Sequence, residues 1–221
     1  MVTISVGKSP NEKDFMVHES FLTSRSEFFR RALNGSWEEA ETRVINLLND
    51  KPDIVAFYVN FVYTGQLSTG FKNEEELQNP TSSTFPTYIE AEYKIIFDIY
   101  ILAEKLQDVN AKNAVLEVVL LVSGIADNED YCYKPSTKTV NTLSEGTPPH
   151  SPVRKPIADA WAELDVKQLC ESYHSMHKDF REDVVQCFSK FFQKPLGNTV
   201  AEKGVTAYLE AEKVQDPGAY P

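Results

Sequence analysis

Cys170, His174 and His177 are the three side chains whose types and spacing best fit a chemical site. They stand at positions i, i+4 and i+7, so a helix would place them along one face, and thiolates and imidazoles are ligands that Zn²⁺ prefers. Three ligands on one straight helix need a fourth from elsewhere to surround a tetrahedral ion. Cys170 and His177 also flank an apolar stripe, which favours a half-buried helix with polar flanks. A metal-dependent enzyme built on these residues is kept as an alternative.

Nucleotide binding and nucleophilic catalysis find little support in the sequence. Gly7-Lys8-Ser9 resembles the end of a phosphate-binding loop, but that motif needs an earlier glycine at the place where this chain has Val2. The chain has no Gly-x-Ser-x-Gly elbow, and no cysteine carries a known nucleophile signature. His18 follows apolar residues, so we expect a packed imidazole hydrogen-bonded to backbone or to a carboxylate. We therefore expect no enzyme activity, no cofactor and no bound metal.

The charge of the chain argues against nucleic acid as a partner. Its 33 acidic and 22 basic residues give a formal net charge of −11, whereas binding to phosphates requires a surface rich in Lys and Arg. The apolar stretch around Glu117 is too short to cross a bilayer. The first residues lack the basic and apolar segments of a secretion signal, and the 3 cysteines are typical of a reducing compartment. We expect an intracellular protein of the cytoplasm, the nucleus or both, with no membrane contact.

Hydrophobic periodicity predicts a small sheet and several helices in the first half of the chain. In the first helix, Phe21 and Leu22 are expected to face inward. The helix at 110–122 is apolar on most sides and is expected to be well buried. The expected strands cover 2–6, 15–17 and 43–47. Helices are expected from 18, after a capping box at 24–27, with Pro52 in the first turn of the next helix, and over about 88–106 and 110–122.

Capping residues mark the expected ends of these helices. Ser24 and Glu27 have the spacing of a capping box ahead of the second helix. Asn34-Gly35 is expected to end that helix in a left-handed conformation. A side chain at Asn49 or Asp50 is expected to cap the next helix.

The second half of the chain changes in composition. Residues 126–156 are rich in Pro, Ser and Thr and poor in apolar side chains, which predicts a linker or a long mobile loop. An amphipathic helical pattern returns at 157–193, and a last helical stretch is expected at 200–214. We expect a domain at 1–125, a linker at 126–156, a helical extension at 157–214 and a tail at 215–221. Many helices with a small N-terminal sheet indicate the α+β class.

Three ordered blocks resemble the signature of the BTB/POZ domain family over about residues 2–125. The first block runs from 15 to 29, the second is Phe-Val-Tyr-Thr-Gly at 61–65, and the third, at 99–108, contains a Leu-Ala pair. The helical remainder resembles the C-terminal extension common in fungal members. The residues that carry the likeness are Phe15, Val17, His18, Leu22, Ser26, Phe28, Phe29, Phe61, Tyr63, Thr64, Gly65, Leu102 and Ala103.

The resemblance implies a small mixed sheet capped by a cluster of α-helices, with additional C-terminal helices. It also implies protein–protein interaction without catalysis, since BTB domains self-associate or act as adaptors. Some members bind a cullin and present substrates for ubiquitination. The expected partners are therefore proteins: a second copy, the target of an adaptor, or a cullin as the alternative. In this interpretation His18 and its signature neighbours are core residues that define the fold.

Two features separate the chain from well-known members of the family. The sequence starts at the first predicted strand, without the preceding helix that dimeric members exchange, so a strongly swapped homodimer is not expected. The connection at 71–86 is longer and more acidic than usual. It lies near the region that members use to approach a cullin, which argues against that partner.

Overall fold

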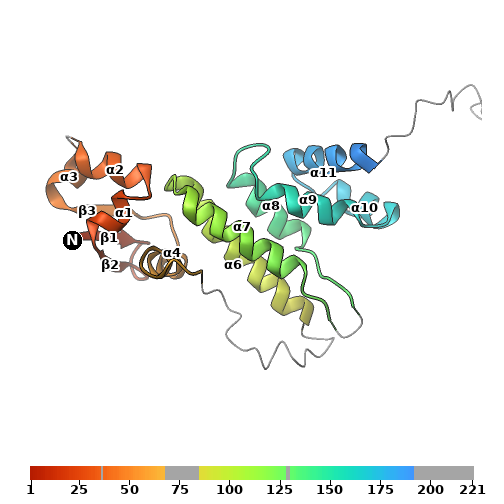
Figure 1. Cartoon of the computed structure of the whole chain (residues 1–221), viewed down its shortest axis with the longest axis horizontal. Helices are drawn as coiled ribbons and strands as arrows, with labels where there is room; N and C mark the ends of the chain where they lie inside the picture. Colours follow the sequence, from red (N-terminus) through yellow and green to blue (C-terminus); the bar gives the residue numbers. More distant parts are fainter. Residues whose placement is uncertain (36, 68–84, 128–129, 192–221) are drawn as a thin grey trace, which may run out of the picture.

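Helices dominate the structure, and a three-stranded sheet lies at its N-terminal end (Figure 1). The computed structural model describes residues 1–35, 37–67, 85–127 and 130–191. The strands are β1 (Val2–Val6), β2 (Lys13–Val17) and β3 (Val44–Leu47). The helices are α1 (Glu19–Thr23), α2 (Glu27–Asn34), α3 (Glu38–Thr42), α4 (Pro52–Thr64), α6 (Phe85–Lys105), α7 (Val109–Ser123), α8 (Thr137–Glu145), α9 (Arg154–Ala162), α10 (Val166–Tyr173) and α11 (Lys178–Phe191). The expected α+β class is confirmed.

The sheet is mixed, as expected, and its strand order is β2-β1-β3. β1 runs antiparallel to β2, with Ile4 opposite Phe15, and parallel to β3, with Ile4 opposite Ile45. Ile4, Ile45 and Leu47 are buried, because the helices cover this side of the sheet. Gly7 ends β1 at a φ of +85°, and a side chain there would meet the Asn11 carbonyl oxygen at 3.0 Å. Only glycine adopts this turn without strain.

The turn after α2 differs from the expected left-handed stop. Gly35 has a φ of −99° and a ψ of −169°, which is extended backbone. A Cβ atom at Gly35 would lie 2.7 Å from the indole of Trp37. The glycine is therefore explained by the close approach of Trp37 and not by a positive φ.

Both ends of α4 are defined by local chemistry, although the first end differs from expectation. The N-cap is Lys51, which provides no side-chain cap, so neither Asn49 nor Asp50 caps the helix. The Asp50 carboxylate instead lies 2.5 Å from Lys105 Nζ on α6. Gly65 ends the helix at a φ of +70°, and its N–H donates to a carbonyl one turn earlier.

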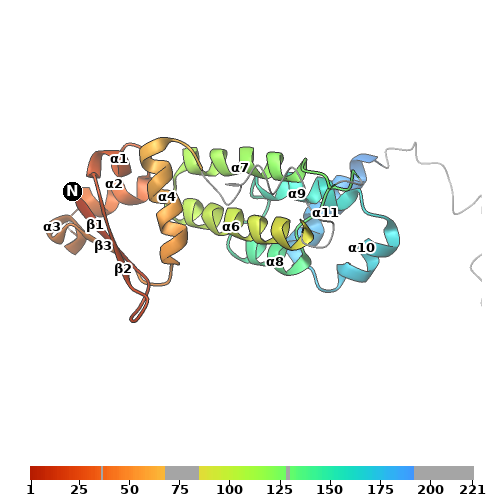
Figure 2. The same ribbon diagram turned by 90° about the horizontal axis from the view of Figure 1, so that it is seen from below.

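α6 and α7 form a helical hairpin that extends from the sheet towards the C-terminal helices (Figures 1 and 2). α7 buries a single face, through Val115, Val119 and Val122. Leu120 and Leu121 are 60% and 70% exposed. The expectation that this helix is buried on most sides is therefore wrong, since no other described element covers its outer face.

The stretch at 126–156, expected as a linker or long loop, contains α8 and the start of α9. α8 has few apolar residues, but its Val140 and Leu143 are both fully buried. The side chain of Ser136 caps the helix by accepting from the N–H of Thr139. α8 therefore has the composition of a loop, although both of its apolar side chains lie in the core.

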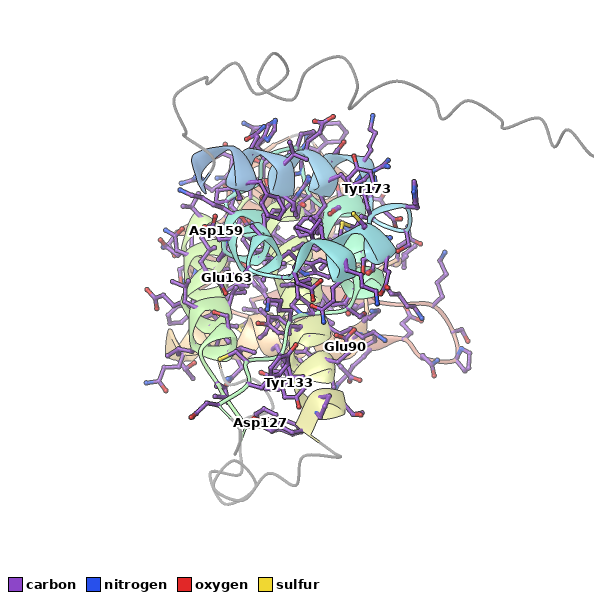
Figure 3. All side chains as sticks on the ribbon, turned by 90° about the vertical axis from the view of Figure 1, so that its right-hand side faces the viewer. Glu90, Asp127, Tyr133, Asp159, Glu163 and Tyr173 are labelled. Atoms are coloured by element: carbon purple, nitrogen blue, oxygen red, sulfur yellow. The ribbon has the colours of Figure 1, made fainter. Side chains whose placement is uncertain are left out.

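α8 is attached to α6 through Glu90. The Glu90 carboxylate accepts hydrogen bonds from the Ser136 N–H at 2.8 Å, the Ser136 hydroxyl at 2.5 Å and the Thr139 hydroxyl at 2.6 Å. Figure 3 shows Glu90 and Tyr133 at the same end of α6, where the Tyr133 hydroxyl donates to Asp127 at 2.8 Å. The C-terminal helices therefore pack on the α6–α7 hairpin, while the division of the chain into domains stays a prediction.

A fully buried arginine joins the last helices to one another. Arg154, on α9, is 0% exposed and donates to the Thr147 hydroxyl at 3.1 Å, to the Thr147 carbonyl at 2.8 Å and to the Pro148 carbonyl. Its Nη1 lies 3.5 Å from the Asp183 carboxylate on α11, which also contacts His150 Nδ1 at 3.0 Å. This network attaches α11 to the turn between α8 and α9.

Candidate functional site

The residues considered for a metal site do not share one helix. Cys170 lies in α10, which ends at Tyr173, while His177 precedes α11. The N–H of His177 donates to Asn141 Oδ1 at 2.7 Å, and both Cys170 and His174 are exposed. Across the described ranges, no group of three or more His, Cys, Asp or Glu side chains is arranged to hold a metal ion. The expected common helical face is wrong because the chain turns after His174.

His18 is exposed, so the expectation of a packed core imidazole is wrong. It is the N-cap residue of α1, directly after β2. Its backbone N–H donates to the hydroxyl of Tyr63 at 3.0 Å, and its Nδ1 lies 2.9 Å from the same oxygen. The partner is therefore a tyrosine hydroxyl at the end of α4, not backbone or a carboxylate.

The rings of His18, Phe21 and Tyr63 form one exposed group, which we name the aromatic patch. The centroids of Phe21 and Tyr63 lie 4.9 Å apart, and each lies 6.0 Å from the imidazole. Phe21 and Tyr63 are 43% and 41% exposed. Because edge and tilted contacts are favourable ring geometries, the rings support one another's orientation.

The aromatic patch comes from two short features of the fold. α1 is a 5-residue helix that buries Leu22 and leaves the adjacent Phe21 43% exposed, since consecutive side chains on a helix point about 100° apart. The expectation that both side chains face inward is thus wrong for Phe21. α4 brings Tyr63 beside α1 at the end of the molecule that carries the sheet (Figure 2).

Arg25 supports α4 next to the patch. Its guanidinium lies over the ring of Phe61, 4.4 Å from the centroid, and its Nη1 is 3.4 Å from the carbonyls of Phe61 and Val62. These carbonyls belong to the last turn of α4, where a cation is favourable. The Nε atom of Arg25 also lies 3.0 Å from a carboxylate oxygen of Asp108, which is completely buried.

Asp108 links three helices beneath this region. It caps α7 by accepting from the Ala111 N–H at 2.9 Å, and it accepts from the Tyr58 hydroxyl at 3.0 Å. Burial, followed by the negative charge of Asp108, raises the pKa of Tyr58 well above its ordinary value. The hydroxyl therefore stays protonated and keeps donating.

Ser26 completes the network from the other side. It is fully buried, it caps α2 by accepting from the Phe29 N–H at 3.2 Å, and its hydroxyl donates to the Leu106 carbonyl at 2.5 Å. The cap is therefore Ser26 and not Ser24, which instead donates to a carbonyl of α1. One side chain both starts α2 and fixes it to the end of α6.

The thirteen signature residues named from the sequence fall into three groups by burial. Those completely or nearly completely buried lie in the interior of the protein, those partly buried pack against the core, and those exposed lie at the end of β2 and of α4. The buried ones are Val17, Leu22, Ser26, Phe29, Phe61, Leu102 and Ala103, the partly buried ones are Phe15 and Phe28, and the exposed ones are His18, Tyr63, Thr64 and Gly65. Core membership is thus wrong for His18 and for the Tyr63-Thr64-Gly65 run.

Comparison with known proteins identifies the sheet end of the molecule. The family model of the BTB/POZ domain matches residues 2–80. These residues form a BTB/POZ domain. No curated protein matches the chain. The BTB/POZ domain is a protein–protein interaction module, and modules of this kind are generally not catalytic.

All three rings of the aromatic patch belong to the BTB/POZ domain. His18, Phe21 and Tyr63 lie inside the matched residues, whereas α6 to α11 lie beyond them. No helix in the part of the chain that the structure describes is both long and apolar enough to cross a membrane. Whether the domain binds a cullin stays a prediction, because residues 68–84 of the acidic connection lie outside the described residues, as do the helix expected at 200–214 and the tail.

Phe21 and Trp37 are surface residues that sequence reasoning missed. Phe21 was expected in the core, and Trp37 was given no role. A usable signal for Phe21 is its place beside Leu22 in a helix of about one turn, because consecutive side chains on a helix point about 100° apart and a short helix packed on one side buries the two unequally. For Trp37 the signal is its acidic surroundings, Trp-Glu-Glu-Ala-Glu at 37–41, which are unusual for a buried indole.

Proposed function

We propose that this protein is a non-catalytic adaptor that binds another protein through the aromatic patch of its BTB/POZ domain. An intracellular location is part of this proposal. So is the absence of enzyme activity, because the described surface groups rings and not a set of catalytic side chains. The partner is a protein that covers the rings of Phe21 and Tyr63.

The exposure of two adjoining aromatic rings is the observation that carries the proposal. Aromatic side chains dominate the binding energy of protein interfaces, and Tyr is among the residues most enriched at their centres. The ring of Tyr63 is already held by His18, so little conformational freedom remains to be lost on binding. A partner that covers both rings gains the free energy of removing their apolar surface from water.

The shape of the molecule suits an adaptor. The patch lies at the sheet end, the α6–α7 hairpin occupies the middle, and α8 to α11 form the other end (Figure 1). A protein bound at the patch therefore leaves the C-terminal helices open to a second partner. Self-association through the patch is the second form of the same function, since a second copy presents the same rings.

Substitution of Phe21 tests the proposal. Phe21→Ser removes the most exposed ring of the pair, and the change is at the surface, so the fold should tolerate it. The matched control is Val185→Ser on α11, whose side chain is 54% exposed at the far end. Sedimentation velocity reports self-association, and affinity capture with mass spectrometry reports bound proteins.

The two variants have opposite expected outcomes. The wild-type chain and the Val185→Ser variant retain the same partner protein or the same oligomer, and Phe21→Ser loses it by about tenfold or more. Unchanged circular dichroism shows that the loss is not unfolding. If Phe21→Ser keeps every partner and the same sedimentation coefficient, the patch is not the binding surface.

A further inference from the structure

The outer edge of β3 has hydrogen-bonding groups that point away from the sheet. The ladder between β1 and β3 includes the Thr3 N–H bonded to the Arg43 carbonyl at 2.9 Å and the Gly7 N–H bonded to the Leu47 carbonyl at 3.2 Å. In a parallel pair, alternate residues of a strand face the partner. Residues 43, 45 and 47 therefore face β1, and the backbone groups of Val44 and Asn46 face outward.

The outward groups are almost unused. The Val44 N–H donates only a long local hydrogen bond, to the Thr42 hydroxyl oxygen at 3.4 Å. Among the described residues, Asn46 has no backbone hydrogen bond on this side. An unpaired edge of this kind can be extended by another strand.

A pocket of about 320 Å³ lies against this edge, and we name it the β3 groove. Its apolar part comes from the partly buried Phe28 and Ala32 of α2 and from Ile45, and its outer wall is Trp37, which is 67% exposed. Its polar part comes from the exposed side chains of Asn46 and Gln107. Within the described residues, neither carboxamide has a hydrogen-bond partner, so both are free to bind a peptide backbone. The residues that define the groove are Phe28, Ala32, Trp37, Ile45, Asn46 and Gln107.

The surroundings of the β3 groove are acidic. α3 carries Glu38, Glu39 and Glu41 and no basic residue in its last turn. None of the three carboxylates forms an ion pair with a described residue. Arg31 lines the groove, and the Glu27 carboxylate that it contacts at 3.0 Å also pairs with Arg30 at 2.6 Å, so these three groups leave one positive charge against the three glutamates. The net local charge is therefore negative.

We propose that the β3 groove binds an extended, basic segment of a partner protein, which adds a strand to the edge of β3. The inference rests on the proposed adaptor function and names a second binding surface and its mode. The Asn46 backbone supplies main-chain hydrogen bonds, an apolar side chain of the segment fills the space beside Trp37, and its Lys or Arg side chains face α3. Alternate side chains of the bound strand point into the groove, which gives selectivity.

Charge distinguishes this occupant from a second copy of the chain. Pairing of two β3 edges would bring the three glutamates of one α3 near those of the other. Each chain also carries a net charge of −11, which adds to the repulsion between two copies at this edge. A basic segment meets the opposite situation, because both its charge and its free backbone groups complement this edge.

Hydrogen exchange and peptide selection test the proposal on the full chain. In the free protein the amide of Asn46 exchanges quickly, whereas those of Ile45 and Leu47 are protected by β1. A phage library of random dodecapeptides is selected against the wild-type chain and counter-selected against Asn46→Pro, which removes the outward N–H without touching the β1 ladder. Selected peptides are synthesised with blocked ends, and their binding is followed through the Asn46 amide.

The expected peptides are rich in Lys or Arg and slow the exchange of the Asn46 amide. Their affinity falls by about tenfold or more with Trp37→Ala and with the triple change of Glu38, Glu39 and Glu41 to Gln. N-methylation of every second residue of the peptide abolishes binding when the methylated N–H groups are those that face β3. Methylation of the other set of residues leaves binding unchanged, because only alternate N–H groups face β3.

Three results would overturn the proposal. The first is an Asn46 amide that is already protected from exchange in the free chain. The second is that every selected peptide binds Asn46→Pro or Trp37→Ala as well as it binds wild type. The third is peptide binding that survives N-methylation in both registers. An oligomer that Trp37→Ala dissociates would assign the groove to a second copy instead. Phe21→Ser leaves peptide binding intact, so failure at the β3 groove and failure at the aromatic patch are told apart.

Discussion

The carboxylate of Asp108 is completely buried and lies 3.0 Å from the guanidinium Nε of Arg25, whose side chain is 14% exposed. The two residues are far apart in sequence, and the pair joins the start of α2 to the start of α7 beneath the end of α4. The pair therefore also supports the aromatic patch, because it holds together the elements that carry the patch.

Asp108→Ala should destabilise the protein far more than the loss of an ordinary helix cap. The change removes the α7 cap and the acceptor of the Tyr58 hydrogen bond, and it leaves Arg25 without its counter-charge. Together these losses should lower the free energy of unfolding by about 3–5 kcal/mol. The control is Asp165→Ala, which removes an exposed cap that accepts from Gln168 and should cost about 1 kcal/mol. Urea unfolding measures both. Equal costs would mean that the buried network contributes nothing beyond the cap.

Gly146→Ala should be destabilising because α8 ends directly against α6. A methyl group at Gly146 would lie 2.6 Å from side-chain atoms of Ile101, and overpacking of this kind costs about 1–3 kcal/mol. Gly124 is the matched control, since it is also a right-handed C-cap but its nearest neighbour would be 3.6 Å away. Thermal unfolding should show a lower Tm for Gly146→Ala alone. Identical Tm values for the two variants would show that α8 does not rest on Ile101.

Alkaline conditions should destabilise the protein through two buried tyrosines. Burial raises the pKa of Tyr58 and of Tyr93 above the ordinary value of 10.0, with the Asp108 charge adding to the effect at Tyr58. Above that pH the unfolded chain loses protons that the folded chain keeps, so stability is present at lower pH and falls as pH rises. Each tyrosine should contribute a slope of about 1.4 kcal/mol per pH unit.

Variants with Phe at these positions isolate the alkaline effect. Urea midpoints measured from about pH 9 to about pH 11 should fall less steeply for Tyr58→Phe, and least for the double variant with Tyr93→Phe. The comparison concerns the slope with pH, so the hydrogen bond that Tyr58→Phe loses at every pH does not affect it. A double variant with the wild-type slope would contradict the assignment.

Arg154→Met should loosen α11 without disturbing the sheet. The change removes every donor that Arg154 gives to the turn at 147–148 and leaves the Asp183 carboxylate with His150 as its remaining partner, a loss of about 3–5 kcal/mol. Hydrogen exchange by mass spectrometry should show faster exchange in α11 and unchanged exchange in β1. Arg181→Met is the control, because that residue lies on the same helix, its guanidinium lies 5.1 Å from the ring centroid of Tyr173, and it forms no ion pair with a described residue. Unchanged protection of α11 would remove the anchoring role of Arg154.

The parts of the fold that could be predicted from sequence are those with local signals. β1 and β3 follow from β-branched alternation, and α4 follows from its apolar stripe and its terminal Gly65. α8 could not be predicted in this way. It has only two apolar residues, Val140 and Leu143, so its composition is that of a loop. Its first turn is held by three hydrogen bonds to Glu90 on α6, and these are visible only in the folded structure.

The candidate site depended on tertiary placement more than the fold did. The blocks that contain His18 and Tyr63 could be identified from their motifs, but the motifs do not say which members are exposed. Phe21 and Leu22 are adjacent in a helix of about one turn, and the position of α4 decides which of them is buried. The close approach of the Trp37 indole to Gly35 is likewise a property of the folded turn and has no local pattern.

Site-specific photo-crosslinking tests the central claim most directly. p-Benzoylphenylalanine in place of Phe21 puts a reactive ring of similar shape in the aromatic patch, and the same residue in place of Val185 serves as the control at the far end. Irradiation in living cells should give discrete covalent adducts from position 21, either with one partner protein or with a second copy, and none of these from position 185. If position 21 gives no adduct beyond those seen from position 185, the patch is not the binding surface and the account is contradicted.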